Sequence, residues 1–262
     1  MTATTFAPSP PPTADLTTRP MPAPIPFSRL LRVEWRKSID TRAARWMLIL
    51  TAALSVGIMA IPILRPGDID QTYSEYLLIA AVGVSLLLPV ISILTLTTEW
   101  TQRTVLATFT AEPRRGRVLA AKVAAATILA LAGTLLAYAV TAGALAISSA
   151  AGREVTWTLQ ANHIAGLAGF MVLSVGMAVA FGALIQNTAA AIVAYFALPT
   201  AFAAIGLAVS GARDWFDSAT AFNWVLEGDW AGNSGPILAN TVLWVALPLA
   251  AGAVRTIRRE AK

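Results

Sequence analysis

The stretch 76–98 reads YLLIAAVGVSLLLPVISILTLTT, which is 23 residues without a charged side chain. A helix rises 1.5 Å per residue, so about 20 residues cross a bilayer core about 30 Å thick. This stretch therefore predicts a transmembrane helix. Further uncharged runs of spanning length cover 46–64, 123–152, 155–212 and 230–254.

The run 155–212 is too long for one crossing, because as a single helix it would extend about 87 Å. Its most polar interior point is Gln186-Asn187-Thr188, where we expect the chain to fold back. The sequence thus predicts an all-α membrane protein with six transmembrane helices. The predicted spans are 46–64, 77–98, 118–149, 164–185, 189–209 and 236–255.

The composition agrees with a membrane protein. Only 13% of residues are charged and 56% are hydrophobic, whereas about 25% of an average soluble domain is charged. A soluble enzyme is therefore excluded as a class. With Cys 0 and His 1, the chain has no disulfide framework and no multi-histidine metal site.

The basic residues predict the orientation, because Lys and Arg near span ends stay on the cytoplasmic side. Of the 19 Lys and Arg, all but Arg65, Arg153 and Arg213 fall before the first span, between spans two and three or just inside the start of span three, or at and after the end of the last span. We expect both termini to be cytoplasmic, in a multi-pass plasma-membrane protein. The net charge of +5 is then a topology signal and not a nucleic-acid interface.

Residues 1–26 hold 8 of the 15 prolines and predict a disordered cytoplasmic tail, followed by a membrane domain over 27–262. In 27–45, apolar residues recur at helical spacing with basic residues on other faces, after a possible N-cap at Ser28. This pattern predicts a helix lying in the membrane interface, and the alternative is a solvated basic segment. The residues assigned to the interfacial helix are Phe27, Leu30, Leu31, Trp35, Arg36 and Lys37.

The predicted cytoplasmic loop 99–117 is the more informative of two segments outside the spans. Val105, Leu106 and Phe109 can form a short apolar face, and Pro113 with Gly116 indicates a turn. Such a loop can dock on a cytoplasmic partner. The alternative, that its cations only enforce topology, does not explain the apolar face.

The second segment, 211–236 on the predicted outer side, is aromatic although it is not a span. We expect it to dip into the outer interface or to cap the helix bundle. Its aromatic residues are Trp215, Phe216, Phe222, Trp224 and Trp230.

No catalytic motif is visible. None of the three lysines follows a glycine, so a phosphate-binding P-loop is excluded, and no G-x-S-x-G elbow occurs. The predicted cores of the spans hold no ionisable residue, which argues against a proton or sodium antiporter. We therefore predict a protein that is not an enzyme and that binds no cofactor itself.

The ordered set of segments resembles the membrane subunits, or permeases, of type 2 ATP-binding-cassette exporters in their short actinobacterial-like form. Leu31-Arg32-Val33-Glu34-Trp35-Arg36-Lys37 with Thr41-Arg42 resembles the amphipathic connecting helix of that family. The loop from Glu99 to Lys122 resembles the loop with the coupling helix, and 211–236 is similar to the small outer helices. The resemblance covers about 27–258, and the proline-rich tail lies outside it.

The resemblance implies two permease subunits, identical or different, and two separate cytoplasmic ATPases that hold ATP and Mg. It implies a path for an amphipathic or hydrophobic substrate near spans two and five, in contact with membrane lipids. The competing hypothesis is a non-transporting scaffold or sensor that binds a cytoplasmic regulator or anionic lipid. The residues expected in the ATPase-coupling loop are Glu99, Arg103, Thr104, Val105, Leu106, Phe109, Pro113, Arg114, Arg115 and Lys122.

Overall fold

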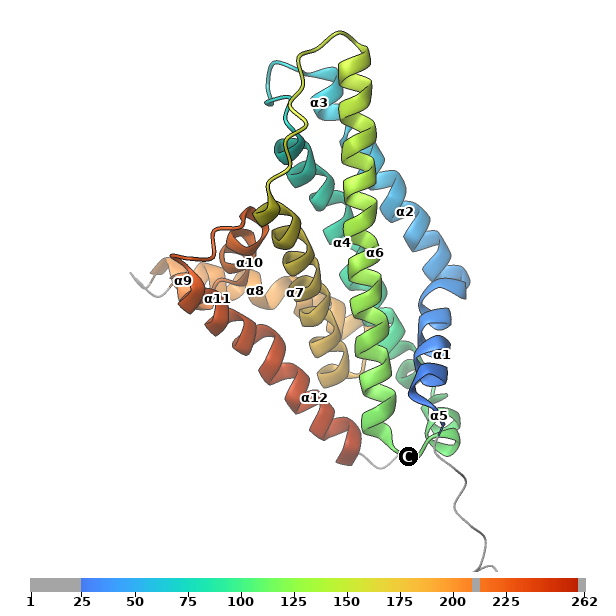
Figure 1. Cartoon of the computed structure of the whole chain (residues 1–262). Coiled ribbons are helices and arrows are strands. Elements are labelled where there is room, and N and C mark those ends of the chain that lie inside the picture. Colours follow the sequence, from blue (N-terminus) through green and yellow to red (C-terminus); the bar gives the residue numbers. More distant parts are fainter. Residues whose placement is uncertain (1–24, 209–212, 259–262) are drawn as a thin grey trace, which may run out of the picture.

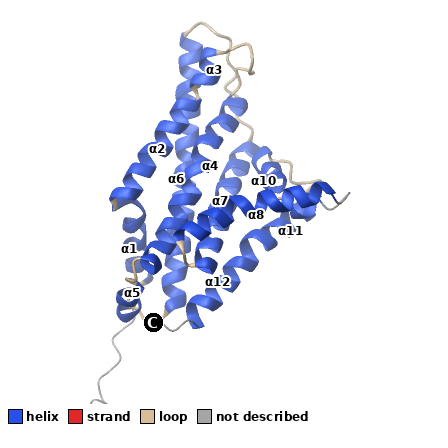
Figure 2. Ribbon diagram, turned by 180° about the vertical axis from the view of Figure 1, so that it is seen from behind, coloured by secondary structure: helices blue, strands red, loops and turns tan. Residues whose placement is uncertain are grey.

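The computed structural model describes residues 25–208 and 213–258, and these are almost entirely helical (Figure 2). The described part has no strand, only an isolated bridge between Thr72 and Thr156. The predicted tail falls almost wholly outside the described residues. The elements are α1 (Phe27–Asp40), α2 (Arg42–Ile58), α3 (Ala60–Leu64), α4 (Tyr73–Thr101), α5 (Val105–Ala111), α6 (Arg115–Ala150), α7 (Ala161–Ile185), α8 (Thr188–Ala208), α9 (Arg213–Phe216), α10 (Ser218–Glu227), α11 (Ser234–Thr241), the π-helix η2 (Val242–Ala246) and α12 (Leu247–Arg258).

Five helical segments are long and apolar enough to cross a membrane. They match predicted spans one, two, three, four and six. The fifth predicted span, 189–209, is helix α8, whose apolar part Thr188–Ala204 is shorter than these five. The five long segments are Arg42–Leu64, Tyr73–Thr101, Arg115–Ala150, Ala161–Ile185 and Ser234–Arg258.

The predicted fold-back inside the long uncharged run is confirmed. Helix α7 ends at Ile185, and Gln186 takes the left-handed conformation with φ of 57° before α8 begins at Thr188. The Asn187 side chain accepts a hydrogen bond from the Ala190 N–H at 3.0 Å. This contact satisfies one of the unpaired amides at the start of α8.

Helix α4 is central and packs against α2, α6 and α7. Large side chains such as Tyr76 and Ile91 are fully buried on it. A Cβ on Gly83 would lie 2.6 Å from the Ser55 Cα of α2, so only glycine allows these two helices to cross this closely. The buried core is therefore built around α4.

The elements divide between two ends of the molecule (Figure 1). Helices α1 and α5 lie at one end, called the α5 end here, and α3 lies at the other. Helix α6 has 36 residues, or about 54 Å, and so exceeds a hydrocarbon core of about 30 Å. Helix α1 packs along α6 near the α5 end, beside its first turns.

Helices α7 and α12 both finish at the α5 end. The Gln186 Nε2 donates to the Thr256 Oγ1 at 3.1 Å, and the Arg255 guanidinium donates to the Leu184 carbonyl at 2.6 Å. Gly252 allows this contact, because a Cβ there would lie 2.7 Å from the Ala183 backbone. Since α7 and α12 run in the same direction, the chain between them must turn back through α8.

The predicted interfacial helix 27–45 differs from the structure in three respects. The helix already begins at Phe27 with Pro26 as its N-cap, so Ser28 is not the cap. It is broken at Thr41, whose backbone is extended (φ −71°, ψ 145°) between α1 and α2. The residues of α1 that are buried are Glu34 and Ser38, while Phe27 stays 42% exposed and the assigned Leu30, Leu31 and Trp35 are half-buried. Glu34 forms an ion pair with Lys122 of α6, which explains why the polar side of α1, with Glu34 and Ser38, faces the bundle.

Candidate functional site

The segment between α4 and α6 is organised around the short helix α5. Arg103 has a positive φ of 58°, and the Thr104 N–H donates to the Glu99 carbonyl at 2.9 Å, so the chain turns sharply out of α4. Pro113 lies between the end of α5 and the start of α6 at Arg115. The chain therefore turns at Pro113 as predicted, whereas Gly116, predicted to belong to the same turn, already lies in α6.

The predicted apolar face of this loop is divided. Val105 is buried, and Phe109 is half-buried with its ring edge-on to Trp100 at 6.0 Å between centroids. The Arg115 guanidinium lies 4.8 Å from the centre of the Phe109 ring, within the range of a cation–π contact. Leu106 instead points outward and is 48% exposed, because on a helix it lies about 100° from Val105.

The end of α5 is fixed by a buried carboxylate. Glu112 is 3% exposed, and its side chain accepts from the Arg117 guanidinium at 3.3 Å and from the Arg114 N–H at 3.3 Å. The same Arg117 guanidinium donates to the Ile25 carbonyl at 2.7 Å. This Glu112 clamp ties α5 to the first turn of α6 and to Ile25, two residues before α1.

The beginning of the loop is fixed by four charged side chains, Glu34, Lys37, Glu99 and Lys122, called the charge ring here. Lys37 Nζ donates to Glu34 at 2.7 Å and to Glu99 at 2.5 Å. Lys122 Nζ lies 2.6 Å from Glu34 and 3.3 Å from Glu99. Each charge therefore touches two opposite charges, and the closed ring joins α1, α4 and α6 with no net charge.

Acids and lysines alternate around the charge ring, and this order matters for stability because two of the four side chains are buried. The side chains of Glu34 and Lys122 are only 4% and 8% exposed, so water does little to solvate them. A buried charge is tolerated when an opposite charge and hydrogen bonds replace its hydration. Lys37 is the most open member at 35% exposure.

The pKa of Lys37 reports the same balance. Burial of its ammonium group lowers the pKa, but the hydrogen bonds and negative charges of Glu34 and Glu99 outweigh this effect and raise it above the ordinary value of 10.5. Lys37 is therefore charged at neutral pH.

Arg115 connects the loop to the last helix as well. Its guanidinium contacts the carbonyls of Thr256 and Ile257 at 3.5 and 3.4 Å, near the end of α12 where carbonyls lack helical partners. Both ends of the described chain thus meet the start of α6, Ile25 through Arg117 and Ile257 through Arg115.

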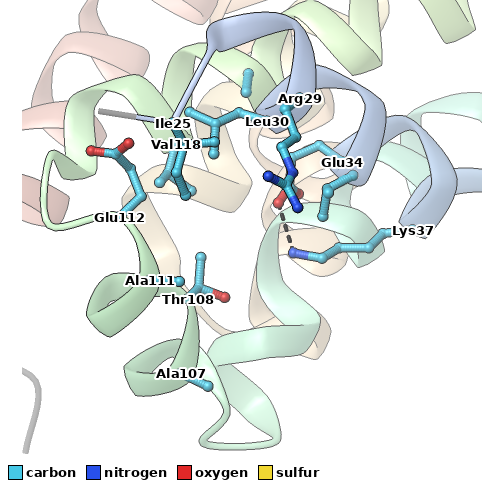
Figure 3. A pocket seen from close by; sticks show the side chains of 12 residues that line it. Ile25, Arg29, Leu30, Glu34, Lys37, Ala107, Thr108, Ala111, Glu112 and Val118 are labelled. Atoms are coloured by element: carbon cyan, nitrogen blue, oxygen red, sulfur yellow. Dashed lines mark hydrogen bonds and ion pairs between the residues drawn. The ribbon is translucent and has the colours of Figure 1, made fainter. Parts of the chain in front are cut away.

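Two hollows flank the charge ring. One of about 310 Å³ lies between α1, α5 and α6, with an apolar floor that includes Val118 and Ala111 (Figure 3). The other, of about 350 Å³, lies between the α1–α2 junction and α4, and Ile91 and Thr98 line it. Lys37 lines both hollows, so the charge ring has an opening on each side.

The predicted aromatic segment 211–236 begins outside the described residues, and the rest contains the short helices α9, α10 and the start of α11. Phe222 is buried, Trp224 is half-buried, and the Trp230 Nε1 donates to the Val225 carbonyl at 3.1 Å. Trp215 and Phe216 are exposed. Helix α10 packs on α7, where a Cβ on Gly166 would lie 2.6 Å from the Val225 carbonyl oxygen, an arrangement that caps the bundle.

The structure brings together residues that the sequence assigned to separate segments. The sequence assigns Lys37 to the interfacial helix, and Glu99 and Lys122 to the coupling loop. It places Glu34 only in a family-like motif and does not single out Glu112. The signal in the sequence is that both are acids within mainly basic segments, which points to partners of opposite charge.

No protein-family model, no curated protein and no solved structure matches this chain. Among the described residues, no group of three or more His, Cys, Asp and Glu side chains could hold a metal ion. The fold itself defines a class. The chain is an all-α, multi-helix apolar protein whose five long helices indicate a multi-pass membrane protein.

Proposed function

We propose that this chain is the permease subunit of a type 2 ATP-binding-cassette exporter. The observation that carries the proposal is how residues 102–114, called the α5 loop from here on, are anchored at both ends while helix α5 stays on the surface. Helix α5 leaves Leu106 exposed, as are Arg103 and Arg114 beside it, while the two ends of the loop are tied into the bundle by the charge ring and the Glu112 clamp. A surface helix anchored in this way is suited to receive a partner and to move the helices behind it.

The proposal assigns the energy source to the partner. Lys37 and Lys122 are held by carboxylates in the charge ring, and no lysine of the chain follows a glycine. A P-loop lysine must be free to meet a nucleotide phosphate. ATP and Mg are therefore expected on separate cytoplasmic ATPase subunits.

The charge ring and the Glu112 clamp suggest how motion of α5 would reach the membrane helices. Glu99 precedes the loop on α4 and Lys122 follows it on α6, and the charge ring joins them to α1. A push on α5 would be transmitted to α4 and α6 together, because moving either helix alone would separate buried opposite charges. Arg115 would extend the motion to α12 through its contacts with Thr256 and Ile257.

In this proposal the chain crosses the plasma membrane six times, with α8 as the fifth crossing. Helix α8 has 21 residues, or about 31 Å, which approaches the thickness of a hydrocarbon core. The ends of the described chain, which meet at the α5 end, then lie on the cytoplasmic side, and both termini are expected there. A second permease subunit would complete the path for an amphipathic or hydrophobic substrate.

A second candidate function, a scaffold or sensor that binds anionic lipid, is favoured by a different observation. Arg29, Arg32 and Arg36 are exposed on α1 and form no ion pair with an acid of the described residues. This surface needs no ATPase, so the two functions differ in their partner.

The test places a photo-crosslinking residue at Leu106 of the full chain in its native cells. A matched variant carries it at Leu64 of α3, which is 77% exposed at the opposite end of the molecule. We expect a P-loop ATPase crosslinked from position 106 only, and ATP hydrolysis by the purified complex. If position 106 yields lipid alone, or no P-loop protein, the permease proposal is wrong.

A further inference from the structure

The most deeply buried side of helix α1 is a polar line of Glu34 and Ser38, while its apolar face is only partly covered, with Trp35 against the core. Glu34 and Ser38 are its buried residues, and the Ser38 hydroxyl donates only to the Glu34 carbonyl of the same helix. At 100° per residue, the arc centred on Leu31 and Trp35 lies about 60° around the helix from this line. These two side chains remain half-buried, so apolar burial is incomplete where α1 now lies.

The joint between α1 and α2 allows α1 to move as a unit. Thr41 alone separates the two helices, and its extended backbone breaks the helical hydrogen bonding. The Thr41 hydroxyl accepts from the Ala44 N–H at 3.2 Å, so α2 is capped without help from α1. The ion pair that crosses this joint, Arg45 to Asp40 at 3.5 Å, is exposed and weak.

The outward surface of α1 is strongly basic. Arg29, Arg32 and Arg36 recur at spacings of three and four residues and therefore form one stripe, although Arg29 also lines the hollow that Glu34 lines. No acid of the described residues lies within ion-pairing distance of them. Figure 3 shows Arg29 at the hollow between α1 and α5.

We propose that α1 is a hinged arm with two binding surfaces, the charge ring that holds it against α6 and an anionic membrane surface that captures it when the ring opens. The anionic membrane is inferred as the second surface because its negative charge complements the exposed arginines of α1. The arginine stripe attracts lipid phosphates, and the arc of Phe27, Leu31 and Trp35, centred about 130° around the helix from the stripe, enters the boundary between head groups and acyl chains. This inference does not rest on the proposed transport function, but it rests on the lipid binding of the second candidate function, which uses the same three arginines.

Different interactions stabilise the two positions of α1, docked on the bundle and bound to the membrane. The docked position satisfies the four charges of the ring and keeps the Arg117 hydrogen bond to the Ile25 carbonyl, but it leaves apolar side chains half-covered. The membrane position covers the apolar arc and pairs the arginines, while the members of the charge ring regain water or lipid partners. Anionic lipid should therefore shift the equilibrium, because it binds one state better than the other.

The experiment uses the absence of cysteine from the chain. Spin labels on the Ser28→Cys, Ala120→Cys variant report the distance from the N-terminal end of α1 to α6, and both positions are exposed. The full chain is measured in nanodiscs of phosphatidylcholine alone or mixed with phosphatidylglycerol. Because α1 has 14 residues, swinging it moves Ser28 by on the order of 20 Å.

We expect one short distance in phosphatidylcholine and an added longer distance with phosphatidylglycerol. Raising the salt concentration should reduce the longer population, since exposed charges are screened and buried ones are not. Replacing Arg29, Arg32 and Arg36 by glutamine should remove it, whereas Arg65→Gln at the opposite end should not. Lys122→Met should increase it.

Two results would overturn the inference. If the wild type shows the same short distance in both lipids, α1 is a fixed part of the bundle. If a longer distance appears equally in both lipids, or survives removal of the arginine stripe, the second surface is not an anionic membrane. Both readings come from the wild type and the surface variants, so they hold even if Lys122→Met fails to fold.

Discussion

Glu34 of α1 accepts a hydrogen bond from Lys122 of α6 at 2.6 Å, although 88 residues separate them in the chain. Both side chains are more than nine-tenths buried. Two desolvated charges hold an amphipathic helix against the bundle, at the point where the α5 loop joins α4 and α6. The contact therefore determines both the position of α1 and the rigidity of the base of the loop.

Replacing Lys122 by methionine should strongly destabilise the protein. The side chain keeps a similar length, but Glu34 is left buried beside Lys37 alone. Removing one partner of a buried pair costs about 3–5 kcal/mol, which thermal or SDS unfolding in detergent would detect. Asp40→Asn is the control, because its exposed pair with Arg45 is worth at most about 1 kcal/mol. Equal stability losses in the two variants would contradict the buried ring.

Acids and lysines alternate around the charge ring, and this order leads to a second prediction about stability. Exchanging Glu34 and Lys122 alone places Lys beside Lys37 and Glu beside Glu99, so the double variant should be less stable than the wild type. Reversing all four charges restores four opposite-charge contacts and should recover much of the loss. Unfolding measured under identical conditions compares the two. Recovery by the two-residue exchange would mean that the four charges do not act as a ring.

The raised pKa of Lys37 predicts an effect of high pH. A raised pKa means that the folded state holds this proton more tightly, so the contribution is complete below the unfolded value of 10.5. It is lost as pH rises through the higher folded pKa, and pH 6 to 9 should have no effect through Lys37. Lys37→Arg keeps its charge at high pH, so its melting temperature should fall less steeply above pH 10 than that of the wild type. Parallel curves would exclude this role.

Gly83 predicts a packing effect at the crossing of α2 and α4. Gly83→Ala places a methyl group 2.6 Å from the Ser55 backbone, so the helices must separate, at about 1–3 kcal/mol. Gly57→Ala is the matched control, because a Cβ there has nothing within 4 Å and alanine favours a helix. Unfolding should show a loss for the first and no loss for the second. If Gly83→Ala caused no loss of stability, α2 and α4 would be farther apart at this crossing than in the structure.

The sequence predicted the helical class and the places of the long helices, because uncharged runs and their polar interruptions are local signals. The fold-back at Gln186 was visible for the same reason. The break at Thr41 was missed, since the amphipathic pattern of 27–45 continues across it and only the packing of α1 on α6 requires the bend.

The charge ring could not be predicted from the sequence. Glu34, Glu99 and Lys122 are far apart in the chain, and the positive-inside rule already explained the lysines as topology signals. Only the packing of α1 beside α4 and α6 shows that these charges neutralise one another. Leu106 was likewise grouped with Val105 and Phe109, because hydrophobicity alone does not show which side of a seven-residue helix meets the bundle.

Phe109 carries the last prediction, which concerns the α5 loop alone. Phe109→Ala removes the edge contact with Trp100 and the cation–π contact with Arg115, each worth about 0.5–1.5 kcal/mol. Because α5 has few other anchors at its centre, hydrogen exchange should become faster across 105–111 while α7 keeps its protection. Leu106→Ala is the control, since its side chain points outward and should leave exchange unchanged. If Phe109→Ala instead weakened protection throughout the bundle, α5 would be part of the global folding unit, and a push on it could not act as a local signal to α4 and α6.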